Sequence, residues 1–167
     1  IGHSAGGAMT DSASNVFIGS EAGLTHTHSN GENVAIGKEA YEAIDSGYGN
    51  VVIGNEAMKS SGSSNTPLYC VAIGYQALNG TTTADYNVGV GYRAGNTLTT
   101  GSENTIIGHD CDVASADNTN NVIIGNNLTA TDKDNAVFIG NNTNHIENDF
   151  NADATWNYSS DERQKKD

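Results

Sequence analysis

The sequence predicts an all-β protein: a parallel β-solenoid or β-roll of about nine coils with repeats of about 17 residues, assembled as an elongated homotrimer. Three observations lead to this prediction. A short string recurs along the chain, β-branched residues precede its glycine, and the expected strands are apolar on both faces. The composition agrees, because 36% hydrophobic residues are too many for a disordered chain and 20 Gly supply many turns.

The recurring string has the form Asn-Val-x-Ile-Gly-x-x-Ala, as in NVFIGSEA from Asn15 and NVVIGNEA from Asn50. Its glycines, called here the anchoring glycines, are 17, 18, 17, 20, 17, 17, 17 and 15 residues apart. The length changes fall in Ser/Thr/Gly/Asn-rich stretches between copies, which is typical of a solenoid. The anchoring glycines are Gly2, Gly19, Gly37, Gly54, Gly74, Gly91, Gly108, Gly125 and Gly140.

Each copy predicts one short strand that ends at its glycine, because Val and Ile favour strands and turn residues bound the run. The chain has no helical pattern of apolar residues. Strands in neighbouring coils lie about 4.8 Å apart, so nine coils predict a rod of about 40 Å. A small residue, usually Ala, follows each glycine by three positions and fits a tight corner.

Alternation along the strand predicts which residues share a face. The flanking columns, three residues and one residue before each glycine, are expected inside the coil. The strand-centre column, two residues before the glycine, is then expected outside, where its uncharged residues need a covering surface. A parallel homotrimer is one solution, and a second layer of inter-repeat segments is the alternative. The expected trimer interface is Phe17, Ala35, Val52, Ala72, Ile106, Ile123 and Phe138.

Asparagine stands four residues before most anchoring glycines, interrupted by Cys70 and Ala136. Stacked amides can form a hydrogen-bonded ladder along the rod. Cys70 and Cys111 belong to coils about 9.6 Å apart and to different columns, so they are expected to be free thiols. Free thiols fit assembly in a reducing cytoplasm.

Seven Lys and Arg against 20 Asp and Glu give a formal net charge of −13, which disfavours nucleic acid as a partner. No apolar run approaches the roughly 20 residues of a membrane helix, so membrane insertion is not expected. No cofactor is expected.

The string Val-x-Ile-Gly-x-x-Ala resembles the repeats of trimeric autotransporter adhesin heads and of phage tail fibres and tailspikes. The stretch from Ser160 to Lys165 is similar to the opening of the intramolecular chaperone that ends many phage fibres. This resemblance implies autocleavage before Ser160, with Ser160 as the nucleophile and Lys165 as its base. It implies three regions: solenoid 1–142, transition 143–158 and the start of the chaperone 159–167.

The same resemblance implies a virion tail fibre, extracellular after assembly in the host cytoplasm, that attaches to a host surface glycan or another receptor. Other virion tail proteins are expected partners, and the mature rod is not expected to be an enzyme. Two alternatives stay open: a bacterial trimeric surface adhesin and a glycan-depolymerising tailspike.

Three groups of side chains are candidate sites. Tyr75 and Tyr92 occupy successive coils and, with Lys38 or Arg93, could present a face to sugar rings; two ordinary half-exposed tyrosines are the alternative. His26 and His28 form a His-x-His pair that could bind a metal at a trimer axis, or lie in a polar loop. The pairs Asp110 with Asp112 and Asp132 with Asp134 are weaker candidates for Ca²⁺.

Overall fold

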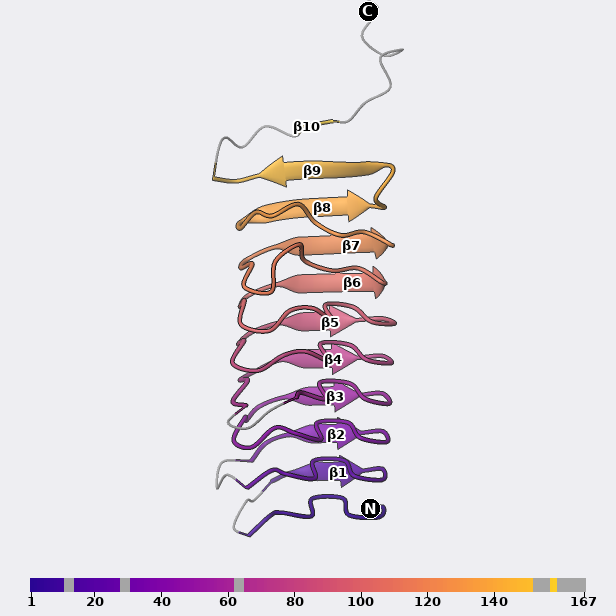
Figure 1. Cartoon of the computed structure of the whole chain (residues 1–167), viewed down its shortest axis with the longest axis vertical. Helices are drawn as coiled ribbons and strands as arrows, with labels where there is room; N and C mark the ends of the chain where they lie inside the picture. Colours follow the sequence, from indigo (N-terminus) through magenta and orange to yellow (C-terminus); the bar gives the residue numbers. More distant parts are fainter. Residues whose placement is uncertain (11–13, 28–30, 62–64, 152–156, 159–167) are drawn as a thin grey trace, which may run out of the picture.

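The computed structural model describes residues 1–10, 14–27, 31–61, 65–151 and 157–158. Within these ranges, ten strands form one sheet in the order of the sequence, like the rungs of a ladder (Figure 1). β1 to β8 are parallel, β9 is antiparallel to β8, and β10 is antiparallel to β9. The strands are β1 (Val16–Ile18), β2 (Val34–Ile36), β3 (Val51–Ile53), β4 (Val71–Ile73), β5 (Val88–Val90), β6 (Thr105–His109), β7 (Val122–Asn126), β8 (Ala136–Gly140), β9 (His145–Asp149) and β10 (Asn157–Tyr158).

The predicted all-β solenoid with a repeat of about 17 residues is confirmed, but it has about seven turns instead of nine. Gly2 belongs to an opening segment without a strand of its own, and the chain reverses after β8. Seven steps between parallel strands give a rod of about 34 Å at about 4.8 Å per step. The expected transition segment contains β9 and β10, whereas residues 159–167 lie outside the described residues.

The parallel strands pair in register, so each sequence column is a physical row along the rod. Val51, Val52 and Ile53 of β3 face Val71, Ala72 and Ile73 of β4, although 20 residues separate their glycines. The extra residues are accommodated between the strands, which leaves the ladder unbroken.

The prediction of the strand faces is wrong. The strand-centre residues are buried inside their own coil, and the flanking valines and isoleucines are the exposed or half-buried ones. Phe17, Ala35, Val52, Ala72, Ile106, Ile123 and Phe138 therefore form the core of a single chain and do not face outward as the expected trimer interface. The coil is too narrow for two β-branched side chains per strand, so the single central side chain enters it.

The narrow core is filled by complementary sizes. Large Phe17 lies against Gly23, where an added Cβ would be 2.6 Å from the Phe17 ring. Small Ala35 shares its coil with buried Tyr41, at the position equivalent to Gly23. Gly89 and Gly95 both leave room for Leu78, since a Cβ on either would approach that side chain to 2.7–2.8 Å. Close packing thus makes the side-chain size at the strand centre depend on the size of the residue six positions later.

The anchoring glycines meet two requirements at once. Most have φ between 131° and 140°, a region that favours glycine. A Cβ on Gly37 would also overlap the carbonyl oxygen of Gly54 in the next coil. Glycine is therefore required both by its own conformation and by the approach of the neighbouring backbone.

The amide ladder is confirmed. The Oδ1 atom of Asn33 accepts hydrogen bonds from the backbone N–H of Asn50 at 3.0 Å and from its Nδ2 at 3.1 Å. Asn104 repeats both contacts on Asn87 at 2.9 and 3.1 Å. These side chains are buried, so the ladder satisfies amides that would otherwise destabilise the coil.

Cys70 stands in this ladder as a poor replacement for asparagine. Its backbone N–H still donates to Asn50 Oδ1, at 2.8 Å, but its Sγ atom takes the place of the carbonyl that should accept from Asn87 N, at 3.4 Å. Sγ also contacts the carbonyl oxygens of Leu68 and Ala84. In the coil of Asn104, the Nδ2 atom of that asparagine donates hydrogen bonds to the carbonyl oxygens at the two equivalent positions. Burial raises the pKa of the Cys70 thiol to about 11, so it stays protonated. As predicted, both cysteines are free.

We predict that Cys70→Asn stabilises the protein by about 1 kcal/mol, because the new amide completes the ladder with stronger acceptor and donor groups. Cys70→Ala is the matched control and should destabilise it, since it leaves Asn87 N without an acceptor. Urea denaturation followed by circular dichroism measures both. A less stable Cys70→Asn protein would show that the ladder does not set the preference at this position.

Candidate functional site

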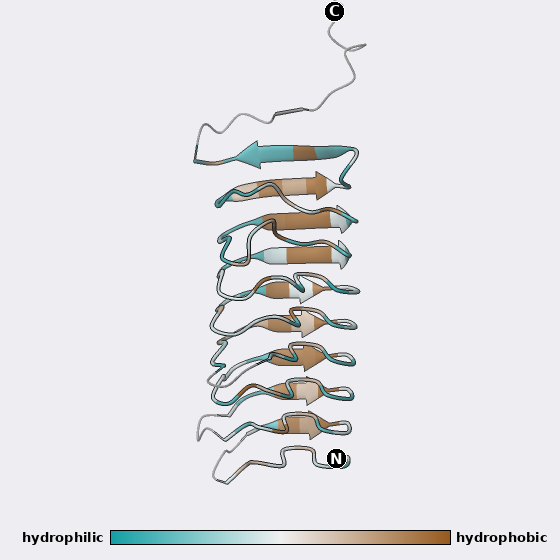
Figure 2. Cartoon of the chain, in the orientation of Figure 1, coloured by the Kyte–Doolittle hydropathy of each residue, from teal (hydrophilic) through white to brown (hydrophobic). Residues whose placement is uncertain are grey.

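The outer face of the sheet is a continuous apolar surface of the rod. It consists of the two flanking columns, which continue from β1 to β8 without a charged residue. Figure 2 shows the hydrophobic colour repeated from strand to strand along this sheet. Val16, Ile18, Ile53, Ile107, Ile124 and Ile139 are each 36–45% exposed. We call this surface the aliphatic strip. It is formed by the flanking columns, which the sequence predicts inside the coil, and not by the strand-centre column, which it predicts outside.

Aromatic side chains border the strip on both sides in the middle of the rod. Tyr75 and Tyr92 stack with ring centroids 5.4 Å apart, and His109 continues the stack at 5.0 Å from Tyr92. On the other border, Tyr69 and Tyr86 stack at 5.5 Å. The expectation that Tyr75 and Tyr92 lie side by side is confirmed.

The stacking changes what these tyrosines offer to a ligand. The rings of Tyr75 and Tyr92 are nearly parallel, 12° apart, so each covers one face of the other, and His109 stacks on Tyr92 as well. A sugar ring stacks on an aromatic face rather than on its edge. Lys38 lies two coils from Tyr75 and pairs with Glu39 at 2.6 Å, while Arg93 lies 3.4 Å from Asp110. The four residues therefore do not form one sugar-binding face.

His26 is fully buried, not part of a polar surface loop. Its ring lies 5.9 Å from that of Phe17 and 5.8 Å from that of Tyr41, centroid to centroid. A ring enclosed in its own coil is out of reach of the axial metal site expected for three chains. His28, like Ser160 and Lys165, lies outside the described residues. Within the described part, no group of three or more His, Cys, Asp or Glu is arranged to bind a metal.

The acidic pairs considered for Ca²⁺ are occupied by protein groups. Asp110 contacts Arg93 and His109, and Asp112 accepts hydrogen bonds from the backbone N–H groups of Thr97 and Val113. Burial raises the pKa of Asp112. Asp132 accepts from Asn118, and Asp134 accepts from the backbone N–H of Thr119. These carboxylates brace neighbouring loops.

A second cluster surrounds Glu39 on the turn side of the coils. Its carboxylate pairs with Lys38 at 2.6 Å and Lys59 at 2.5 Å, and Lys59 also reaches Glu42 at 2.7 Å. Hydrogen bonds from Lys38 and Lys59 lower the pKa of Glu39 to about 2. The hydrogen bond to Glu39 raises the pKa of Lys59. Sequence reasoning missed this cluster, because Lys59 is outside the repeated string.

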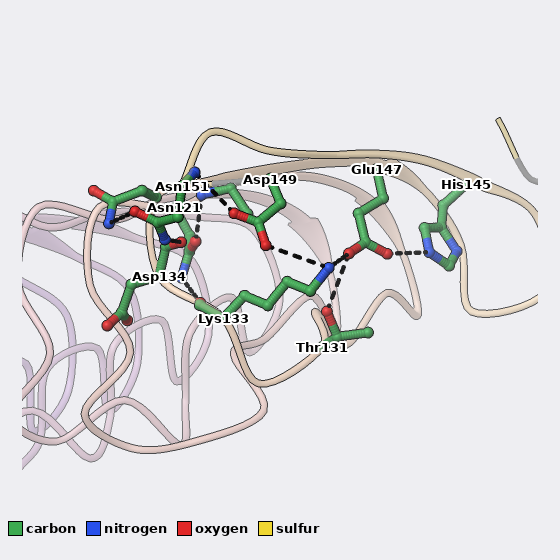
Figure 3. Close-up of polar contacts among 10 residues, drawn as sticks. Asn121, Thr131, Lys133, Asp134, His145, Glu147, Asp149 and Asn151 are labelled. Carbon is green, nitrogen blue, oxygen red and sulfur yellow. Dashed lines mark hydrogen bonds and ion pairs between the residues drawn. The ribbon is translucent and has the colours of Figure 1, made fainter. Parts of the chain in front are cut away.

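The C-terminal end of the solenoid is closed by β9, whose residues are mostly hydrophilic (Figure 2). Lys133 reaches across from the preceding loop to Glu147 at 2.5 Å and to Asp149 at 3.6 Å (Figure 3). Thr131 donates to the same Glu147 carboxylate, and His145 lies 3.7 Å from it. Polar contacts on an antiparallel strand thus cover an edge that another parallel coil would otherwise extend.

The described part has no helix of the length and apolarity needed to cross a bilayer. Comparison of the chain with protein-family models, with characterised proteins and with solved structures finds no match in any of the three. The surfaces of the rod and the resemblance of its repeats are therefore the guides to its function.

We predict that Glu39 makes the protein less stable in acid. Its pKa is lower in the fold than the usual value of 4.5, so ionised Glu39 stabilises the native state above about pH 4.5. That contribution disappears as the pH falls towards 2. Glu39→Gln should lower stability at pH 7 and flatten the loss between pH 5 and pH 2. Lys59→Met should flatten this loss of stability in part. Urea denaturation at each pH measures it, and pH profiles of the variants identical to that of the wild type would contradict this role of Glu39.

Proposed function

We propose that the chain is a rod segment of a homotrimeric bacteriophage tail fibre or tailspike, which projects from the virion and attaches it to the host-cell surface. The observation that carries this proposal is the aliphatic strip, which extends along every coil. A large contiguous apolar surface usually marks a protein interface. A parallel trimer would bury the strip of each chain along a common axis.

The structural character of the rod supports a mechanical role. Each coil bonds to its neighbours through the sheet, the amide ladder and the closely approaching glycines. The buried free thiols suit assembly in a reducing cytoplasm before release. The resemblance of the stretch from Ser160 to Lys165 to a phage-fibre chaperone favours a phage fibre over a bacterial adhesin. In that proposal the chaperone assists assembly and cleaves itself before Ser160.

A glycan is the proposed receptor, and one polar feature of the described surface suits a neutral sugar. A recess of about 500 Å³ at the C-terminal end is lined only by asparagine and threonine. Asn141 uses its Oδ1 atom to accept from the backbone N–H groups of Thr143 and Asn144, and Asn142 accepts from Thr129 N. The NH₂ group of Asn142 remains as a donor toward hydroxyl groups. Asn126 and Asn141 belong to the row directly after the anchoring glycines, so the recess lies at the edge of the surface that a trimer would cover. Among the described residues, no charged side chain lines the recess.

We predict that Ile53→Asp separates the chains while leaving the coil folded. The new carboxylate on the strip would be buried unpaired in the trimer, at a cost of about 3 kcal/mol at each interface. Val52→Asp, one residue earlier, should instead unfold the coil because Val52 is in the core. Thr83→Asp adds the same charge at an exposed position away from the strip and from the rows that border it, and is the matched control. Light scattering and circular dichroism distinguish the three; an oligomer of Ile53→Asp as stable as the wild type would overturn the interface.

Attachment is tested with fluorescently labelled protein on a panel of bacterial cells. We expect saturable binding that periodate oxidation of the cell-surface glycans removes. The monomeric Ile53→Asp variant should bind at least about tenfold more weakly, because it loses multivalency. Binding to animal cells and not to bacteria would favour the adhesin, and release of oligosaccharides from bacterial polysaccharide would favour the depolymerase. Absence of binding to every surface would overturn the attachment role.

A further inference from the structure

Two rows of exposed side chains border the aliphatic strip. The first margin is the residue five positions before each anchoring glycine, and the second margin is the residue directly after it. Both lie next to the strand on either side of the strip. Tyr69 and Tyr86 of the first margin stack on each other, as Tyr75 and Tyr92 do in the second. Each margin is therefore a continuous row along the rod.

The two margins match coil by coil. Wherever one margin is acidic the other is basic or His, and wherever one is aromatic, amide or hydroxyl the other is the same. Gly49 with Asn55 is the exception among the eight coils with a parallel strand. The matched pairs are Ser14 with Ser20, Glu32 with Lys38, Tyr69 with Tyr75, Tyr86 with Tyr92, Glu103 with His109, Asn120 with Asn126, and Asn135 with Asn141.

The members of a pair are too far apart to contact within one chain. Six positions of extended backbone separate them by about 20 Å. The contacts in the structure agree: Lys38 pairs with Glu39, and His109 approaches Asp110 and Tyr92. Most members of the margins, among them Glu32, Glu103, Lys38 and His109, are exposed. Within the described part of the chain, contacts run along each margin and none joins the two members of a pair.

A rotation axis parallel to the rod explains the matching. Such an axis brings equal coils of two chains to the same height and sets the first margin of one chain against the second margin of the next. A shift by one coil would put Glu32 against Asn55 and Glu103 against Asn126, so the Glu32–Lys38 ion pair and the carboxylate–imidazole pair of Glu103 with His109 would both be lost. An antiparallel arrangement would also reverse the order of the coils.

We infer that the partner of the aliphatic strip is a second copy of this chain, parallel and in coil register, with first margin against second margin. This inference rests on the proposed self-association and specifies its register. The strip provides the buried apolar area, and the margins select the partner. Glu32 faces Lys38 of the neighbouring copy, Glu103 faces His109, and the tyrosines of the two middle coils meet as aromatic pairs.

Cysteine cross-linking tests this register in the intact assembly. Ser14→Cys combined with Ser20→Cys should give disulfide-linked chains under mild oxidation, because the thiol introduced at position 14 of each chain faces the one at position 20 of the next copy. Each single variant should not cross-link. Ser14→Cys with Asn126→Cys, in different coils, is the matched control. The native thiols are buried and should not interfere.

A charge variant gives a second measurement. Glu32→Lys should weaken self-association about tenfold, because like charges then meet at each symmetry-related interface. Asp117→Lys, at an exposed loop position outside both margins, should leave it unchanged. Two results would overturn the register alone. The first is a double variant that is oligomeric but does not cross-link between positions 14 and 20. The second is cross-linking of the control or of a single variant to the same extent. A monomeric wild-type protein would overturn both the register and the proposed trimer.

Discussion

The narrow interior of the coil is the constraint on which the rest of this structure depends. Each turn admits one strand side chain, so the strand centre enters the core and its two β-branched neighbours must lie outside. The same limit favours alanine at the following corner in the earlier coils and matches Phe17 with Gly23 but Ala35 with Tyr41. A core this thin buries little apolar area per residue, so much of the apolar surface remains for a partner.

The polar interior follows from the same geometry. A buried amide needs partners at fixed positions, and each coil supplies them to the next because the backbone repeats in register. Asparagine can then lie inside a thin core without the cost of an unsatisfied group. Cys70 shows that the fold tolerates one weak hydrogen bond in the ladder, because the sheet and the closely packed glycines still hold the neighbouring coils together.

Repetition makes much of this fold predictable. The strands, the role of the glycines, the amide ladder, the free thiols and the Tyr75–Tyr92 contact all follow from period and register. The predicted strand faces are wrong, but the sequence contains the information to correct them. Asn50 and Val52 are two residues apart and must share a face of the strand, so a buried asparagine ladder implies a buried strand centre. The burial of His26 is not evident from its polar neighbours, because it depends on Phe17 in the same coil and on Tyr41 in the next one. β9 has only one strongly apolar residue, Ile146, and its antiparallel pairing results from the open edge of β8.

Charge placement explains how the proposed assembly can be closed instead of growing into sheets of rods. The strip contains no charge, and the acidic residues beside it are matched, Glu32 with the cation Lys38 and Glu103 with the imidazole of His109. Most of the net charge of −13 therefore belongs to the turns and loops on the other surfaces. Once the strips are buried around an axis, those acidic surfaces face outward, where they repel further copies. A strong apolar attraction on one face and like charge on the others favour a small closed oligomer with a soluble exterior.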